Sequence, residues 1–181
     1  MSGLTLTAWL FGKLPAHGDF IARGLSPAQR DKLDHWLSNE MVQARDVYGA
    51  RFDDAYDAAT PWFMSARDED GIWQGAAICP SVDAAGRRFP IIAGCSADAA
   101  GAAAGMAARS EAAIYRAFEE GLSADGLHQR LADDFMTVTM TWDTIPEGWW
   151  RDGNERVEPD QLAGFAPIGL VTRMLRDFID G

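Results

Sequence analysis

The spacing of apolar residues changes several times along this chain between the period of a strand and the period of a helix. Residues 4–10 alternate between Leu or Ala and other side chains, which predicts a strand with one buried face. Between residues 26 and 48 the apolar residues recur at helical spacing, and Ser26, Pro27 and Gln29 form the signature of a capped helix start. Because both periods occur, the chain predicts a sheet with helices on its faces.

The same patterns predict the remaining elements. Strands are expected over 62–66, 72–79, 88–96, 136–142 and 162–170, the first two paired as a hairpin. Helices are expected over 52–59, in a segment ending at Gly121, after Ser123 as far as Phe135, and over 171–179. The polar segment 143–160 is expected to be a long loop. No fixed period repeats and no linker divides the chain, so residues 1–181 are expected to form a single domain.

The net charge of the chain disfavours some classes of binding partner. Acidic residues number 27 and basic residues 16, a formal net charge of -11. This charge repels nucleic acid and anionic membranes, although it can equally serve solubility alone. A partner with a basic face, or a ligand without phosphate, fits better. No cofactor is expected.

The sequence also indicates a cellular compartment. The N-terminus lacks the features of a signal peptide, and no stretch approaches the roughly 18 apolar residues of a membrane helix. Cys79 and Cys95 lie in apolar stretches, where cysteine behaves as a small hydrophobic residue. We therefore expect a cytoplasmic protein that does not insert into membranes.

Two glycine-containing segments carry most of the chemically interesting side chains: FGKLPAHGDF at 11–20 and PSVDAAGRRFP at 80–90. Each follows an expected strand, and loops in that position are where recognition commonly occurs. Neither segment matches the glycine patterns of a phosphate-binding or dinucleotide-binding loop. The histidines are scattered along the chain, so no metal site is expected.

One alternative is that the two segments form a hydrolytic site. Ser81, His17 and either Asp19 or Asp83 supply the residue types of a catalytic triad. However, Ser81 does not lie in the G-x-S-x-G turn that exposes a nucleophilic hydroxyl. A hydrolase that uses Ser81 with His17 therefore stays as the alternative to a binding or structural role, and we expect no enzyme.

The charged side chains of these segments suggest a network. We expect the two loops to lie side by side at one end of the sheet, with Asp19 paired to Arg87 or Arg88. Elsewhere, Trp149 and Trp150 stand in a polar stretch, where a bulky apolar pair is costly to expose. They either fold back onto the core or anchor a partner.

Taken in order, these motifs resemble the TagF family of type VI secretion-associated proteins. The resemblance covers about residues 11–92 and includes the patterns G-K-x-P-x-x-G-D-F, W-x-G, P-S-x-D-x-x-G-R and F-P. The matching residues are Gly12, Lys13, Pro15, Gly18, Asp19, Phe20, Trp73, Gly75, Pro80, Ser81, Asp83, Gly86, Arg87, Phe89 and Pro90. Residues 97–181 match no motif, as in the variable C-terminal half of the family.

The resemblance implies both a fold and a function. The expected fold is an α/β three-layer sandwich, a mixed sheet with helices on both faces. The expected function is that of a non-enzymatic cytoplasmic regulator, which represses assembly or firing of the type VI secretion system after translation. The implied partner is a secretion component such as the forkhead-associated scaffold protein of the system.

Overall fold

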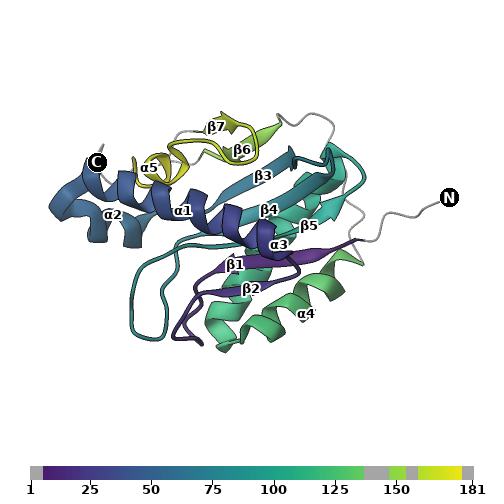
Figure 1. Cartoon of the computed structure of the whole chain (residues 1–181), viewed down its shortest axis with the longest axis horizontal. Helices are drawn as coiled ribbons and strands as arrows, with labels where there is room; N and C mark the ends of the chain where they lie inside the picture. The colour runs from purple at the N-terminus through teal and green to yellow at the C-terminus, as the bar shows by residue number, and fades with distance from the viewer. Residues whose placement is uncertain (1–5, 137–146, 154–158, 177–181) are drawn as a thin grey trace.

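The computed structural model describes residues 6–136, 147–153 and 159–176, which form one sheet and several helices (Figure 1). The strands are β1 (Ala8–Gly12), β2 (Ile21–Arg23), β3 (Trp62–Arg67), β4 (Trp73–Cys79), β5 (Ile91–Ala97), β6 (Gly148–Arg151) and β7 (Asp160–Ala163). The helices are α1 (Pro27–Tyr48), the 3-10 turn η1 (Gly49–Arg51), α2 (Phe52–Ala58), α3 (Ala100–Glu120), α4 (Ala124–Phe135) and α5 (Leu170–Met174). None of these helices combines the length and the apolar character needed to cross a bilayer.

The sheet follows the order β2-β1-β5-β4-β3-β6-β7. Each pair of neighbouring strands in this sheet is antiparallel, so the expectation of a mixed sheet is wrong. The reason lies in the connections. Hairpin-like turns join neighbours such as β3 and β4, whereas the helical segments join strands that are not adjacent, β2 to β3 and β5 to β6. Consecutive strands that lie side by side and parallel would require a crossover connection, which is usually a helix.

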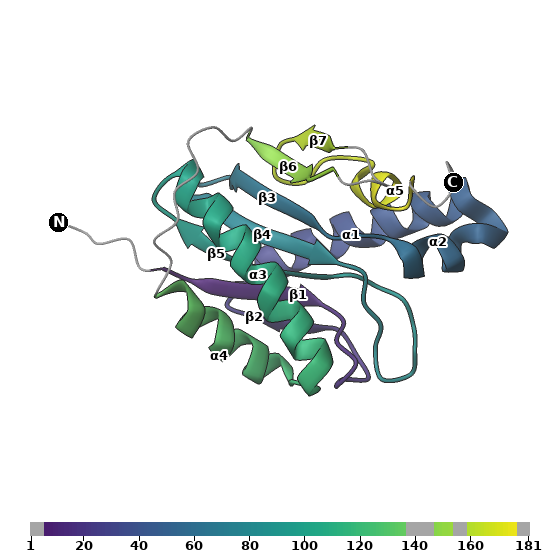
Figure 2. The same cartoon turned by 180° about the vertical axis from the view of Figure 1, so that it is seen from behind.

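Two hydrophobic clusters lie on opposite faces of the sheet, because successive side chains of a strand point in opposite directions. In β4, Ala76 and Ile78 belong to one cluster and Ala77 and Cys79 to the other. Helices α1, α2 and α5 contribute to the first cluster, and α3 and α4 to the second. Figure 1 shows α1 in front of the sheet. Figure 2, the view from the opposite side, shows α3 and α4 on the other face.

The first strand differs from its prediction. We expected one buried face, but every residue of β1 is buried. Trp9 and Phe11 join the α1 side of the core, while Ala8 and Leu10 join the α3 side. The reason is the position of β1 inside the sheet, between β2 and β5, where both faces are covered.

The helix predictions hold where a cap marks the boundary. The side chain of Ser26 accepts a hydrogen bond from the amide of Gln29, and the side-chain oxygen of Gln29 accepts one from the amide of Ser26. Helix α3 starts earlier than the sequence pattern indicated and includes the small residues 101–105. A side chain at Gly75 would collide with the backbone of Ala103, so small residues on both elements let α3 approach β4 closely.

The C-terminal part adds strands where a loop was expected. Segment 143–160 was predicted to be a loop, yet β6 lies within it and pairs with β3 and β7. The strand predicted over 136–142 lies outside the described residues, except for Met136, which is a turn residue. The strand predicted over 162–170 is largely wrong, because β7 ends at Ala163 and α5 starts at Leu170.

Candidate functional site

The loop after β1 and the loop after β4 lie side by side, as predicted. The amide of Ala84 donates to the carbonyl of His17 over 2.8 Å, and the hydroxyl of Ser81 donates to the carbonyl of Lys13 over 2.7 Å. The geometry follows from the sheet order. Strands β1 and β4 are both antiparallel to β5, which lies between them, so they run in the same direction and deliver their loops to the same end.

The carboxylate of Asp83 is the centre of this loop pair. Its side chain is fully buried. One oxygen accepts from Lys13 Nζ at 2.9 Å and from Arg87 Nε at 2.7 Å. The other accepts from the amides of Ala85 and Arg87, at 2.9 Å and 3.0 Å. The hydrogen bond from Lys13 contributes most to holding the pKa of Asp83 well below its ordinary value, so the group stays ionised.

The predicted ion pair of Asp19 with Arg87 or Arg88 is wrong. Arg87 bonds to Asp83 and, through Nη2, to the carbonyl of Gly18 at 2.6 Å. Arg88 turns the other way and binds Asp57 of α2 through two bonds, of 2.7 Å and 2.8 Å. Asp83 and Arg87 belong to the same tight turn, closed by a hydrogen bond from the amide of Asp83 to the carbonyl of Arg87, which brings the two side chains together. Asp19 is exposed and forms no ion pair within the described part of the chain.

Helix α2 supplies residues of the site that the sequence analysis missed. The hydrogen bonds from Arg88 lower the pKa of the Asp57 carboxyl, and Asp53, one helical turn earlier, lies 3.2 Å from the same guanidinium. A signal existed, since Asp53 and Asp57 are spaced to face the same side of a helix. Nothing in the pattern indicated which arginine they would bind.

Three aromatic rings border the charged network. Phe20 is 48% exposed. Its ring centroid lies 4.7 Å from that of Phe89 and 6.0 Å from that of Phe11. The ammonium of Lys13 lies 4.9 Å from the centre of the Phe20 ring, in range for a cation–π contact. The buried lysine is therefore held between a carboxylate and an aromatic face.

The side chains of Ser81 and His17 are each engaged with the backbone. Ser81 donates to the carbonyl of Lys13, and its own amide lies 3.0 Å from the hydroxyl of Tyr56. Burial raises the pKa of Tyr56 well above its ordinary value, so this hydroxyl stays neutral. The Nε2 of His17 accepts a hydrogen bond of 2.9 Å from the amide of Ala124, the first residue of α4. Each side chain braces a loop in this arrangement.

Residues 9–134 match the family model for the TagF N-terminal domain, which is described as type VI secretion system-associated. The chain belongs to this family. The matched segment contains both loops and extends past the residue 11–92 motifs through α3 into α4. No curated protein matches the chain.

The fold of this TagF-family chain is also that of a solved structure. The crystal structure of PA0076 from Pseudomonas aeruginosa PAO1 superposes with a TM-score of 0.73 at 22% sequence identity. The match covers 93% of this chain and 94% of that one. At this identity the likeness shows the fold alone.

The TagF motif residues of the two loops divide by burial into a supporting set and an exposed set. The buried set is Gly12, Lys13, Ser81, Asp83, Phe89 and Pro90, with Pro80 half-buried. The exposed set is Pro15, Gly18, Asp19, Phe20, Gly86 and Arg87. Gly12 has a φ of 134° and its backbone lies against the carbonyl of Pro90, where any side chain would collide. The buried set holds the loops together, and the exposed set is available for contact.

The tryptophan pair of this TagF-family chain lies in β6. Trp149 is fully buried, donates from Nε1 to the carbonyl of Phe165 at 2.8 Å, and has its ring 6.0 Å from that of Trp36. These contacts fit the alternative that it folds onto the core. Trp150 points to the other face, half-buried beside Phe63 at 5.8 Å.

Proposed function

We propose that this chain is a regulator without enzymatic activity that represses assembly or firing of a type VI secretion system by binding one of its protein components. The observation that carries the proposal is the TagF family match over residues 9–134, the segment that builds the paired loops. Repression would occur after translation and in the cytoplasm. The forkhead-associated scaffold protein of the system is the component that the family resemblance favours.

The geometry of the loops supports a binding role over a catalytic one. The groups that chemistry would need, Ser81 and His17, are engaged with the backbone. The groups left at the surface, Phe20 and Arg87, are an aromatic ring and a guanidinium whose side chain is 60% exposed. Aromatic and arginine side chains are those that most often dominate protein–protein interfaces.

The test compares secretion in the native host. Deleting the gene should raise type VI secretion, and overexpressing the protein should silence it, both measured by the amount of a secreted component in the medium. A strain carrying Phe20→Ala should behave as the deletion, while Tyr115→Ala, which removes another exposed aromatic ring on α3, should behave as wild type. Unchanged secretion on both deletion and overexpression, under conditions where the system is expressed, would refute the proposal.

A further inference from the structure

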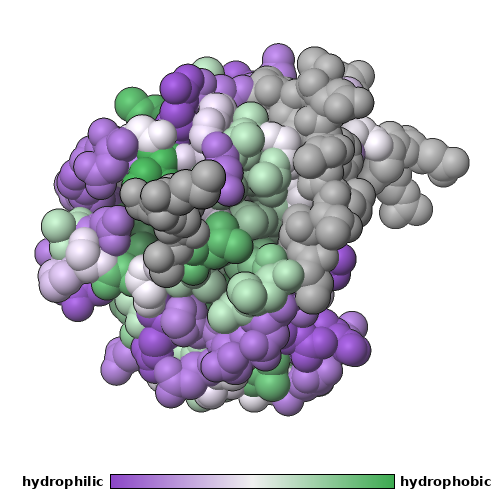
Figure 3. All heavy atoms as spheres, turned by 90° about the vertical axis from the view of Figure 1, so that its right-hand side faces the viewer, coloured by the Kyte–Doolittle hydropathy of each residue, from purple (hydrophilic) through white to green (hydrophobic). Residues whose placement is uncertain are grey.

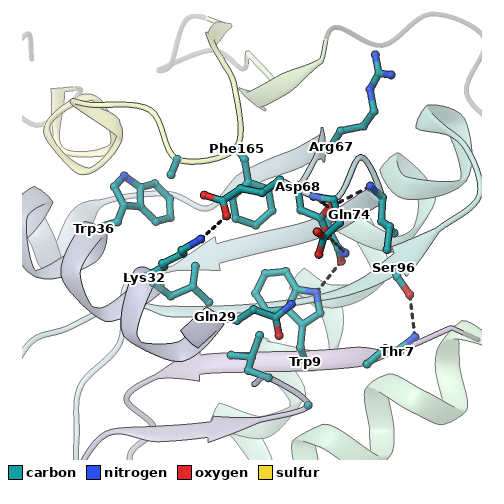
Figure 4. Close-up of a pocket in the computed structure, with 17 residues that line it drawn as sticks. Thr7, Trp9, Gln29, Lys32, Trp36, Arg67, Asp68, Gln74, Ser96 and Phe165 are labelled. Carbon is teal, nitrogen blue, oxygen red and sulfur yellow. Dashed lines mark hydrogen bonds and ion pairs between the residues drawn. The ribbon is translucent and has the colours of Figure 1, made fainter. Parts of the chain in front are cut away.

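A pocket of about 790 Å³ lies at the end of the sheet opposite the paired loops (Figure 4). It opens between the first half of α1 and the turn that joins β3 to β4. Strands β1 and β4 each begin at this pocket, where Trp9 and Gln74 line it, and end at the loops. The volume falls within the roughly 300–1,000 Å³ typical of ligand pockets.

Three aromatic side chains form the apolar part of the pocket walls. Trp9, Trp36 and Phe165 come from β1, α1 and the segment before α5, and Leu33 lies among them. Figure 3 looks at this end of the molecule and shows apolar residues gathered in the middle of the face, with hydrophilic residues below them and to the left. Such walls suit an apolar group from outside the chain.

The polar atoms of these walls already have partners within the protein. The indole of Trp9 donates to Gln74 Oε1 at 2.9 Å, and Gln74 Nε2 donates to Asp68 at 2.9 Å. The indole of Trp36 donates to the carbonyl of Pro167 at 3.0 Å. A polar ligand would have to compete with these bonds, whereas an apolar group would leave them intact.

The rim of the pocket carries consecutive carboxylates, Asp68, Glu69 and Asp70. Asp68 accepts hydrogen bonds from the amides of Asp70 and Ile72, at 3.0 Å each, so it shapes the turn. Glu69 pairs with Lys32 of α1 across the mouth. The carboxylate of Asp70 is exposed and forms no ion pair among the residues that the structure describes.

The cations of the rim do not balance Asp70. Lys32 is taken by Glu69, and Arg67 lies 3.4 Å from Glu147 with its guanidinium over the ring of Trp73. Both ion pairs are exposed, so each contributes little, and an incoming cation can compete for their carboxylates. The rim therefore favours a cation, in agreement with the net charge of -11.

We propose that this pocket binds a segment of a partner protein in which a bulky apolar side chain stands next to an arginine or lysine. The apolar side chain enters among Trp9, Trp36 and Phe165, and the cation meets Asp70 at the rim. The proposal rests on the proposed function as a protein-binding regulator, and it places a contact surface far from the TagF loops.

The experiment uses a random peptide library displayed on phage, panned against the whole chain. The peptides recovered are synthesised, and their affinity is measured by isothermal titration calorimetry. We expect sequences that combine Trp, Phe or Leu with an adjacent Arg or Lys. Recovery of no binding peptide, or only of peptides without a basic residue, would overturn the proposal.

Paired variants locate the binding. Ala166→Trp fills the mouth of the pocket and should weaken binding at least about tenfold, while Ala163→Trp, at another exposed alanine that lies outside the pocket, should not. Asp70→Lys should weaken binding about threefold, while Glu119→Lys, the same charge change on α3, should have no effect. Equal affinity for wild type and Ala166→Trp would place the peptide elsewhere and overturn the proposal.

Two further controls address other occupants. If a chain lacking residues 1–5, which precede the pocket residue Thr7, bound the peptides about tenfold more tightly, the occupant would be the chain's own N-terminal segment. If the protein dimerised and Ala166→Trp abolished the dimer, the occupant would be a second copy. Either result would overturn the proposal of a partner protein.

Secretion in the host separates the two proposals. If the wild-type protein silences secretion and Ala166→Trp does so equally well, the pocket proposal fails and the proposed function stands. If the wild-type protein does not silence secretion, the proposed function fails whatever the peptides do. Loss of silencing in Ala166→Trp but not in Ala163→Trp would support both.

Discussion

The paired loops and the pocket occupy opposite ends of strands β1 and β4, and they differ in whether their charged side chains are buried or exposed. At the loop end a carboxylate and a lysine are buried and bonded to each other, beside exposed groups. At the pocket end the charges stay at the exposed rim and the apolar surface is open. Substitutions among the buried loop residues should therefore affect mainly stability, whereas substitutions around the pocket should affect mainly binding.

The largest effect is expected for Lys13→Met. It removes the buried cation, so the buried carboxylate of Asp83 loses its ion pair with Lys13. Such a loss typically costs about 3 kcal/mol of unfolding free energy. Lys32→Met is the matched control at the pocket end. Its ion pair is exposed and should cost less than about 1 kcal/mol. Urea denaturation measures the unfolding free energy of both variants. Equal losses would contradict the contrast between the loop end and the pocket end.

The pH dependence of stability tests the contribution of the buried, ionised Asp83 at the loop end. Because the folded state lowers the pKa of Asp83, its ionised form stabilises the protein above the ordinary aspartate pKa of about 4. That contribution is lost as the pH falls below this value toward the folded-state pKa. Asp83→Asn should therefore be less stable than wild type at neutral pH, with a difference that narrows below about pH 4. Thermal unfolding over a pH series tests this, and a constant difference would contradict it.

A smaller effect is expected for His17→Ala. The imidazole accepts a hydrogen bond from the first amide of α4, and loss of such a helix cap typically costs about 1 kcal/mol. His35→Ala, an exposed histidine on α1, should change the unfolding free energy by less than about 0.5 kcal/mol. If the histidine variants had equal stability, the loop would not depend on this bond.

The smallest effect is expected for chemical labelling of Ser81. A fluorophosphonate probe should not label it, because its hydroxyl donates to the carbonyl of Lys13 and His17 is bonded to Ala124. Mass spectrometry of the treated protein gives the answer. Labelling of Ser81 that disappears in His17→Ala would restore the hydrolase alternative.

The sequence predicted those parts of the fold that depend on neighbouring residues. The caps at Ser26 and Ser123 and the β3–β4 hairpin are local features, and all are confirmed. Strand β6 was missed because its pairing with β3 joins residues far apart in the chain. Local alternation also could not show that β1 is buried on both faces, since that depends on its place in the sheet.

The candidate site likewise has features that the sequence predicted and features that it did not. The closeness of the loops was predictable, because both follow strands and both are rich in glycine and charge. The partners of the charges were not, since Arg88 and Asp57 are brought together only by the packing of α2. The pocket gave no sequence signal, because Trp9, Trp36 and Phe165 belong to segments with no common motif.

The contacts of Glu40 show that the segment matched by the family model ends before the residues that pack against it. The carboxylate of Glu40 is buried on α1 and accepts hydrogen bonds from the amides of Gly169 and Val171. The family match ends at residue 134, so it excludes both donors, together with β6, one of the two strands that pair with β3. A chain cut at that boundary would lose both donors and the α5 side chains that pack against α1. We therefore expect the shared family segment to be less stable without the C-terminal residues.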